Sequence, residues 1–150
     1  MALNFFGLVD NETKILVNYV PYQGRNSNIG FADDPKNYGL GGAVILKLLE
    51  PYVGMNRKIV MDNWFSSPLL AKRLLDLHTY SLATLRKNRK FTPKMTSRLS
   101  KGQIENYVTD NIMIERYEIS SQFAPFGNLT DYLTLLSNCS LDGVTIAKFV

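Results

Sequence analysis

Cysteine, histidine and tryptophan each occur only once in this chain of 150 residues, as Cys139, His78 and Trp64. One cysteine cannot form an internal disulfide bond, and one cysteine with one histidine cannot assemble a zinc site. These counts exclude a disulfide-stapled domain and a zinc-binding domain. We interpret Cys139 as a small core or strand-end residue and His78 as an exposed residue at a helix end.

Long apolar runs are also absent. No stretch reaches the ~20 apolar residues that a membrane-spanning helix needs. The apolar opening, residues 3–9, has no basic leader and runs into Asp10, which is not the pattern of a signal peptide. With 45% hydrophobic and 20% charged residues, the chain is expected to fold as one globular domain and to be soluble and intracellular.

Acidic residues are missing from one long segment. The net charge is only +4, but no acid lies between Asp76 and Glu105, where seven of the 17 basic residues fall. These seven are Arg86, Lys87, Arg89, Lys90, Lys94, Arg98 and Lys101. A local cationic segment on a nearly neutral body is typical of a contact with nucleic-acid phosphates. A loop kept soluble by its charges is the alternative, and composition alone leaves both open.

The hydrophobic pattern predicts a mixed α/β fold. Residues 1–9 and 13–20 predict two strands of a hairpin, and residues 21–38 predict a loop. Further along, the pattern predicts a helix over 39–50, a strand over 58–61, a helix capped by Ser66 or Ser67, and strands over 80–85, 112–119 and 132–137.

Two aspartates stand at predicted strand ends. A helix between strands 58–61 and 80–85 makes these strands parallel, and reactive groups collect beyond the carboxyl ends of such strands. Asp62 follows the first of them, and Asp10 follows the first strand of the hairpin. From the residues alone, each aspartate is more often a turn residue than a catalytic one.

Several motifs resemble the catalytic domain of piggyBac transposases. Asp62-Asn63-Trp64-Phe65-Ser66-Ser67 resembles the segment around the family's second catalytic aspartate. The segment Val9-Asp10-Asn11-Glu12-Thr13-Lys14, followed by Pro21-Tyr22-Gln23-Gly24-Arg25, resembles the first-aspartate strand and its turn. The segment Thr84-Leu85-Arg86-Lys87-Asn88-Arg89-Lys90 resembles a strand with a basic turn, and Tyr132 to Ser137 resembles the strand before the third acid.

The resemblance implies an RNase H-like mixed sheet flanked by helices, incomplete at its C-terminal side. Residues 1–150 would form a single partial catalytic domain, with 86–104 as a basic insertion or loop. Members of the family use three aspartates and magnesium to cleave and rejoin DNA strands. Asp10 and Asp62 would then be catalytic residues and Mg²⁺ ligands, on neighbouring strand ends with carboxylates about 4 to 7 Å apart.

The same resemblance makes DNA the expected partner and the nucleus an expected location. The residues predicted to contact phosphates are Arg86, Lys87, Arg89 and Lys90. Trp64 and Phe65 are interpreted as core residues rather than as a base-stacking pair. No membrane partner is expected, and a homodimer is left open.

One part of the family pattern has no match here. The third aspartate is not found after residues 132–137, and neither Asp131 nor Asp142 takes its role. We therefore expect a transposase-derived domain that is inactive alone. The alternatives are a co-opted module that binds DNA or proteins without catalysis, and a folded relic. Asp33 and Asp34 have no matched role.

Overall fold

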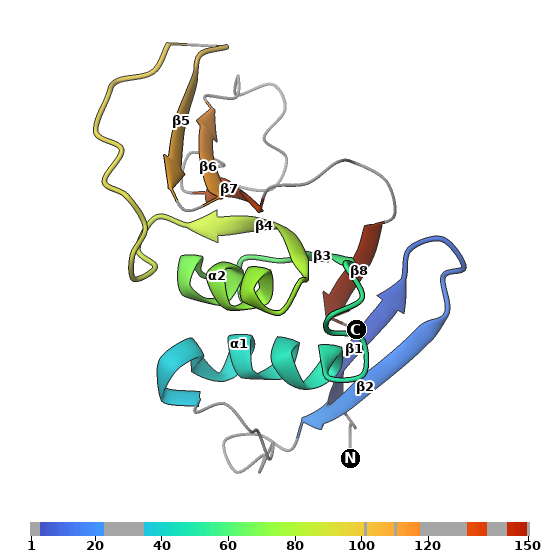
Figure 1. The fold of residues 1–150 in the computed structure, drawn as a ribbon. Coiled ribbons are helices and arrows are strands. Elements are labelled where there is room, and N and C mark those ends of the chain that lie inside the picture. Colours follow the sequence, from blue (N-terminus) through green and yellow to red (C-terminus); the bar gives the residue numbers. More distant parts are fainter. Residues whose placement is uncertain are drawn as a thin grey trace.

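The structure is a computed structural model that describes residues 4–22, 35–100, 102–109, 111–117, 132–137 and 144–149. Its elements are β1 (Asn4–Asp10), β2 (Leu16–Tyr22), α1 (Pro35–Leu49), β3 (Lys58–Met61), α2 (Pro68–Asp76), β4 (Tyr80–Arg86), β5 (Ile104–Thr109), β6 (Ile112–Tyr117), β7 (Tyr132–Ser137) and β8 (Val144–Phe149). The predicted mixed α/β fold is confirmed (Figure 1). Within these ranges, no helix is long and apolar enough to cross a membrane.

The eight strands form one sheet with the order β2-β1-β8-β3-β4-β7-β6-β5. β3 is parallel to β4 and to β8, and the other neighbouring pairs are antiparallel. The predicted hairpin is present as β1 and β2, closed by a hydrogen bond from the Asp10 N–H to the Ile15 carbonyl (2.9 Å). The sheet is therefore mixed, with its parallel strands at the centre.

The first helix begins earlier than predicted. α1 starts at Pro35 instead of 39, but Gly39 interrupts it with a φ of 69°, a left-handed conformation that glycine adopts at low cost. The regular turns therefore begin close to the predicted position. Val44, Ile45 and Leu48 of this helix are fully buried.

β3, α2 and β4 form the predicted strand–helix–strand unit. Ser67 caps α2, since its side-chain oxygen accepts a hydrogen bond from the Leu70 N–H (3.1 Å), and Pro68 begins the first turn. Leu70 and Leu74 form the buried stripe of the helix. As predicted, His78 is exposed just after the helix.

Both helices pack on the sheet and lie side by side (Figure 1). The main core joins α1 and α2 to Phe6 and Leu8 of β1, Ile59 and Met61 of β3, and Ala83 of β4. Side chains alternate along a strand, so Asp62, directly after Met61, belongs to the other face. The core therefore holds the ends of β3 and β4 from one side and leaves Asp62 on the opposite face.

Two strands were not predicted. β5 lies at the sheet edge, where five of its six residues are exposed, so it shows no alternation of apolar and polar residues. β8 lies between β1 and β3, in residues 144–149, for which no strand was predicted. Between β4 and β5, residues 87–100 form turns and irregular structure, in the segment predicted as a basic loop.

Candidate functional site

Asp62 is exposed at the carboxyl end of β3, beside Thr84 of β4. Its Oδ1 atom accepts hydrogen bonds from the Asn63 N–H (2.7 Å), the Asn63 Nδ2 (2.8 Å) and the Thr84 Oγ1 (3.2 Å). Oδ2 accepts none within the described part of the chain. Three donors thus fix one carboxylate oxygen, and the other has no donor among the described residues.

Two arginines of the basic turn, which comprises residues 86–92 at the end of β4, hold the residues that follow Asp62. The Arg86 Nε donates to the Asn63 Oδ1 (2.7 Å), which orients the amide that donates to Asp62. The Arg89 Nη2 donates to the carbonyls of Asn63 (2.8 Å) and Trp64 (2.7 Å). Burial, and then the positive charge of Arg86, lower the pKa of Arg89 below its usual value. We call Asn63, Arg86 and Arg89 the clamp.

The aromatic residues after Asn63 anchor the same turn to the core. The Trp64 ring stacks on Phe6 of β1, with ring centres 5.3 Å apart and an angle of 15° between the planes. Phe65 meets Trp64 edge to face and is only 3% exposed. The interpretation of this pair as core is therefore confirmed for Phe65, while Trp64 is stacked on one face and 37% exposed.

Gly41 of α1 lets the helix pass close to this turn. A Cβ atom at residue 41 would lie 2.6 Å from the Trp64 carbonyl oxygen and 3.1 Å from the Phe65 Cα. These are backbone atoms, so they could not give way as a flexible side chain would. Gly41 therefore permits α1 to support the segment that positions Asp62.

Asp10 occupies a different place and has a different role. Its Oδ2 accepts hydrogen bonds from the Thr13 Oγ1 (2.5 Å) and the Thr13 N–H (2.9 Å), within the turn that joins β1 to β2. The bond from the Thr13 hydroxyl, followed by that from its N–H, lowers the pKa of Asp10 below its ordinary value of 3.8. This is the geometry of a turn residue.

The prediction that Asp10 and Asp62 lie on neighbouring strand ends is wrong. β8 separates β1 from β3, and Asp10 pairs with Thr145, which pairs with Ile59. Asp62 lies three residues beyond Ile59, and β3 is the second strand away from β1. The Cα atoms of Asp10 and Asp62 are therefore roughly 14 Å apart. The physical reason is direction: β1 runs antiparallel to β8 and therefore to β3, so their carboxyl ends point to opposite ends of the sheet.

The two aspartates therefore cannot share one ion in this arrangement. Within the described ranges, no group of three or more His, Cys, Asp or Glu residues is placed to hold a metal. Asp62 offers one oxygen, Oδ2, besides the Oδ1 atom that accepts three hydrogen bonds, whereas Mg²⁺ is bound through several carboxylate and other oxygens in near-octahedral geometry. The described residues thus do not fit a complete magnesium site. Asp33, Asp34, Asp131 and Asp142 lie outside the described residues.

The predicted phosphate-contact residues all lie in the basic turn, where Arg86 is the last residue of β4 and the other three follow it. Lys87 and Lys90 are exposed, as is Arg86, and Arg89 is half-buried in the clamp. The structure thus places the basic turn directly beside Asp62. The resemblance suggested DNA contacts for Arg86 and Arg89. It did not suggest that they also hold the turn after Asp62, because the hydrogen-bond acceptors in that turn lie 23 to 26 positions earlier in the chain.

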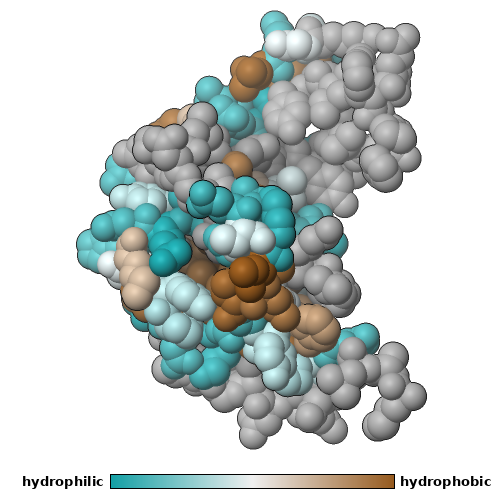
Figure 2. Space-filling view, turned by 90° about the vertical axis from the view of Figure 1, so that its right-hand side faces the viewer, coloured by the Kyte–Doolittle hydropathy of each residue, from teal (hydrophilic) through white to brown (hydrophobic). Residues whose placement is uncertain are grey.

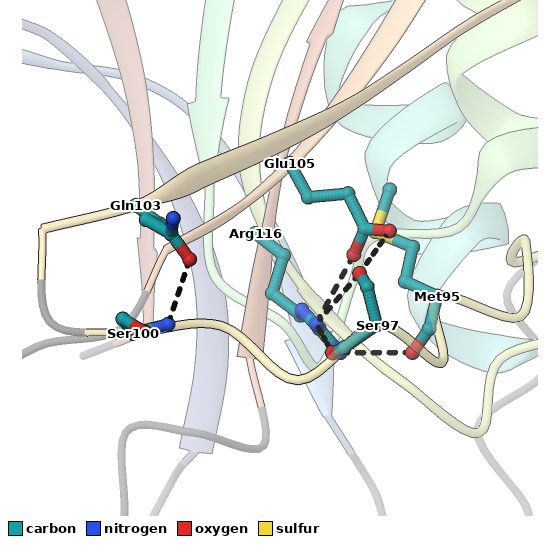
Figure 3. Close-up of polar contacts among 6 residues, drawn as sticks. All are labelled: Met95, Ser97, Ser100, Gln103, Glu105 and Arg116. Carbon is teal, nitrogen blue, oxygen red and sulfur yellow. Dashed lines mark hydrogen bonds and ion pairs between the residues drawn. The ribbon is translucent and has the colours of Figure 1, made fainter.

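A second anchor holds the basic segment further along (Figure 3). Arg116 of β6 points toward it, and its Nη1 donates to the Met95 carbonyl (2.8 Å). Its Nη2 donates to the Ser97 carbonyl and lies 3.1 Å from a carboxylate oxygen of Glu105 on β5. Sequence reasoning missed Arg116 and Glu105, since no local pattern links Arg116 to Met95 and Ser97, which lie 21 and 19 positions earlier, or to Glu105 on the neighbouring strand. Lys94 and Arg98 are exposed beside this anchor.

Comparisons with known proteins identify the family of this chain. The family model described as Transposase IS4 matches residues 1–134. A solved structure, the cryo-EM structure of piggyBac transposase synaptic complex with hairpin DNA, is similar with a TM-score of 0.72 and 27% identity. The similarity covers 94% of this chain but 28% of that one, so this chain spans less than a third of its length. No curated protein matches. The chain therefore belongs to the piggyBac-type transposases within the family described as Transposase IS4.

Proposed function

We propose that this chain is a transposase-derived domain that binds DNA through backbone phosphates and retains one acid of an RNase H-like active site, Asp62. The observation that carries the proposal is the clamp, which joins the turn after Asp62 to the basic turn after β4. The acid and the cations therefore keep a fixed relation to each other. The similar piggyBac transposase structure is a complex with hairpin DNA, which supports the choice of partner.

The chemistry of the two turns suits a phosphodiester. Exposed Lys87 and Lys90, and the Arg86 nitrogens not used by Asn63, give cationic donors without base selectivity. DDE transposase families use divalent metal ions, and carboxylates are preferred ligands of such hard ions. Asp62 would be one such ligand for Mg²⁺, through Oδ2. Because the protein would act on DNA, a nuclear location is part of the proposal.

The salt dependence of DNA binding tests the basic turn. Replacing Lys87 and Lys90 by alanine should reduce the slope of log affinity against log salt on duplex DNA by about 1.8, or about 0.9 per lost phosphate contact. Replacing Arg86 and Arg89 as well should reduce it by up to about 3.6. The measurement is fluorescence anisotropy of a labelled duplex across a salt series. The number of protein copies bound per duplex, obtained from the same titration, distinguishes a monomer from a homodimer.

A matched control removes the same charge elsewhere. Two lysines outside the basic segment serve for this control. Lys14 lies in the hairpin turn, and Lys47 of α1 forms an ion pair with Glu50. Replacing this pair by alanine should leave the slope within error of the unmodified chain. If both lysine pairs change the slope equally, or neither does, the basic turn only solvates the loop and the proposed phosphate contacts are refuted.

We further infer that the isolated chain of 150 residues does not cleave DNA. Asp10 is roughly 14 Å from Asp62 along the sheet, so a single carboxylate at this site leaves the ions of a two-metal mechanism poorly held. Loss of such charge stabilisation changes rates by orders of magnitude. Nicking of a labelled duplex with Mg²⁺ or Mn²⁺ should therefore equal that of the Asp62→Asn variant. Robust nicking that Asp62→Asn abolishes would show that another acid, Asp131 or Asp142, completes the site.

A second function, binding to a protein, is favoured by an exposed apolar surface. The β1–β2 hairpin carries Ile15, Leu16, Val17 and Tyr19, which are 60%, 44%, 38% and 60% exposed. Figure 2 shows a hydrophobic patch in the middle of the face that lies on the right-hand side of Figure 1. Such exposed apolar patches are typical of interaction sites. A co-opted interaction module would use this surface and would not need the basic turn.

A further inference from the structure

The basic turn contains a residue that its local geometry does not explain. Two successive turns follow β4: the Arg89 N–H bonds the Arg86 carbonyl (3.1 Å), and the Thr92 N–H bonds the Arg89 carbonyl (3.1 Å). Phe91 is the third residue of the second turn and has a φ of 64°. That position requires positive φ, which favours glycine or asparagine, and a bulky aromatic residue there is strained.

Packing does not explain Phe91 either. Its side chain is 72% exposed, the largest fraction among the exposed large apolar residues of the described ranges. The Phe91 side chain neither suits its backbone conformation nor fills the core. It therefore contributes no more to the stability of the fold than glycine would at this position. Strained residues of this kind cluster at functional sites. A ligand that an exposed phenyl ring recognises would explain the residue at this position.

The neighbours of Phe91 indicate the class of ligand. Lys87, Lys90 and Lys94 are all exposed within four residues of it, and the segment between Asp76 and Glu105 contains no acid. Lysines hold a nucleic-acid backbone by its phosphates, and an aromatic ring beside them meets the bases. In a duplex the faces of the bases are covered by their neighbours. Only an unpaired base offers a face on which the ring can stack.

Resting on the DNA binding proposed above, we propose that Phe91 is a base-stacking residue for single-stranded DNA held by the lysines of its turn. The clamp makes this stacking site fixed rather than mobile, because Arg89, which begins the turn of Phe91, is bonded to the backbone of Asn63 and Trp64. The turn therefore presents the ring at a constant distance from Asp62.

Binding to single-stranded and duplex DNA tests this role. Phe91→Leu keeps an apolar side chain but removes the ring, so it should weaken binding of a labelled thymidine oligonucleotide of about 12 residues roughly tenfold. Its affinity for a duplex of equal length and the salt slope should stay unchanged. Phe91→Gly should weaken single-strand binding similarly while the melting temperature is equal or higher, since glycine relieves the turn.

A spectroscopic measurement reports stacking directly. Trp64 is the only tryptophan, so in a Trp64→Phe background the Phe91→Trp variant carries a single indole at the stacking position. Its emission should be quenched by the thymidine oligonucleotide and not by the duplex. Equal binding of the oligonucleotide by the Phe91→Leu variant and the unmodified chain, or equal loss on both DNA forms, overturns the stacking role and leaves phosphate binding intact. Failure of the unmodified chain to bind either DNA overturns both proposals.

Discussion

Replacing Phe6 by alanine should reduce the free energy of unfolding by about 4 kcal/mol and loosen the turn that carries Asp62. Phe6 is 1% exposed and lies at the centre of an aromatic cluster. Its ring centre is 5.3 Å from Tyr22, 5.3 Å from Trp64 and 5.9 Å from Phe65. Truncation would remove the buried ring and leave a cavity beneath Trp64, so the loss includes both the transfer and the cavity contributions.

Urea denaturation followed by tryptophan fluorescence measures this effect at the site itself, because Trp64 is the single tryptophan. The native emission of Phe6→Ala should shift to longer wavelength, since the stacked face of Trp64 becomes hydrated. Phe5→Ala is the matched control, because Phe5 is half-buried and meets Tyr19 at a ring distance of 6.1 Å. A loss of stability from Phe5→Ala as large as that from Phe6→Ala would contradict the aromatic anchor.

Replacing Arg89 by alanine should reduce the free energy of unfolding by about 2 kcal/mol. Its guanidinium donates to two backbone carbonyls, those of Asn63 and Trp64, and hydrogen bonds from a charged group contribute more than neutral ones. Their loss leaves both carbonyls without this partner. Arg89→Lys should recover only part of the loss, because one ammonium group lacks the planar fork of the guanidinium.

Arg98→Ala is the control for this change, as Arg98 is exposed in the same basic segment. It removes the same charge and should alter stability by less than about 0.5 kcal/mol. Urea denaturation of the three variants separates the effects. If Arg89→Ala and Arg98→Ala have the same stability, then Arg89 acts as a surface charge and the clamp does not hold the turn after Asp62.

The sequence predicted best where neighbours in the chain decide the structure. Ser67 with Pro68 is a local capping signal, and the apolar stripe of Leu70 and Leu74 defines the buried side of α2. Two strands joined by a helix pair in parallel, so the parallel pairing of β3 with β4 could be predicted from the sequence. The position of Asp62 at their carboxyl ends follows from the same pairing.

The sequence failed where distant segments decide the structure. The failure at Asp10 came from strand order, because nothing local to Asp10 shows that residues 144–149 enter between β1 and β3. The clamp was missed for a related reason. An arginine bonded to carbonyls elsewhere in the fold has the same local pattern as an arginine free to bind phosphate. Only the structure distinguishes these two uses of Arg86 and Arg89.

The position of β8 also has a consequence for the order in which the sheet is completed. β1 and β3 do not pair with each other, and both pair with β8, which is synthesised after every other described strand. The hairpin and the β3–α2–β4 unit can form from local contacts early, whereas their union waits for residues 144–149. Until then, two inner strands expose unpaired backbone groups to other chains. The nascent protein is thus most prone to aggregate in the interval before β8 joins the sheet.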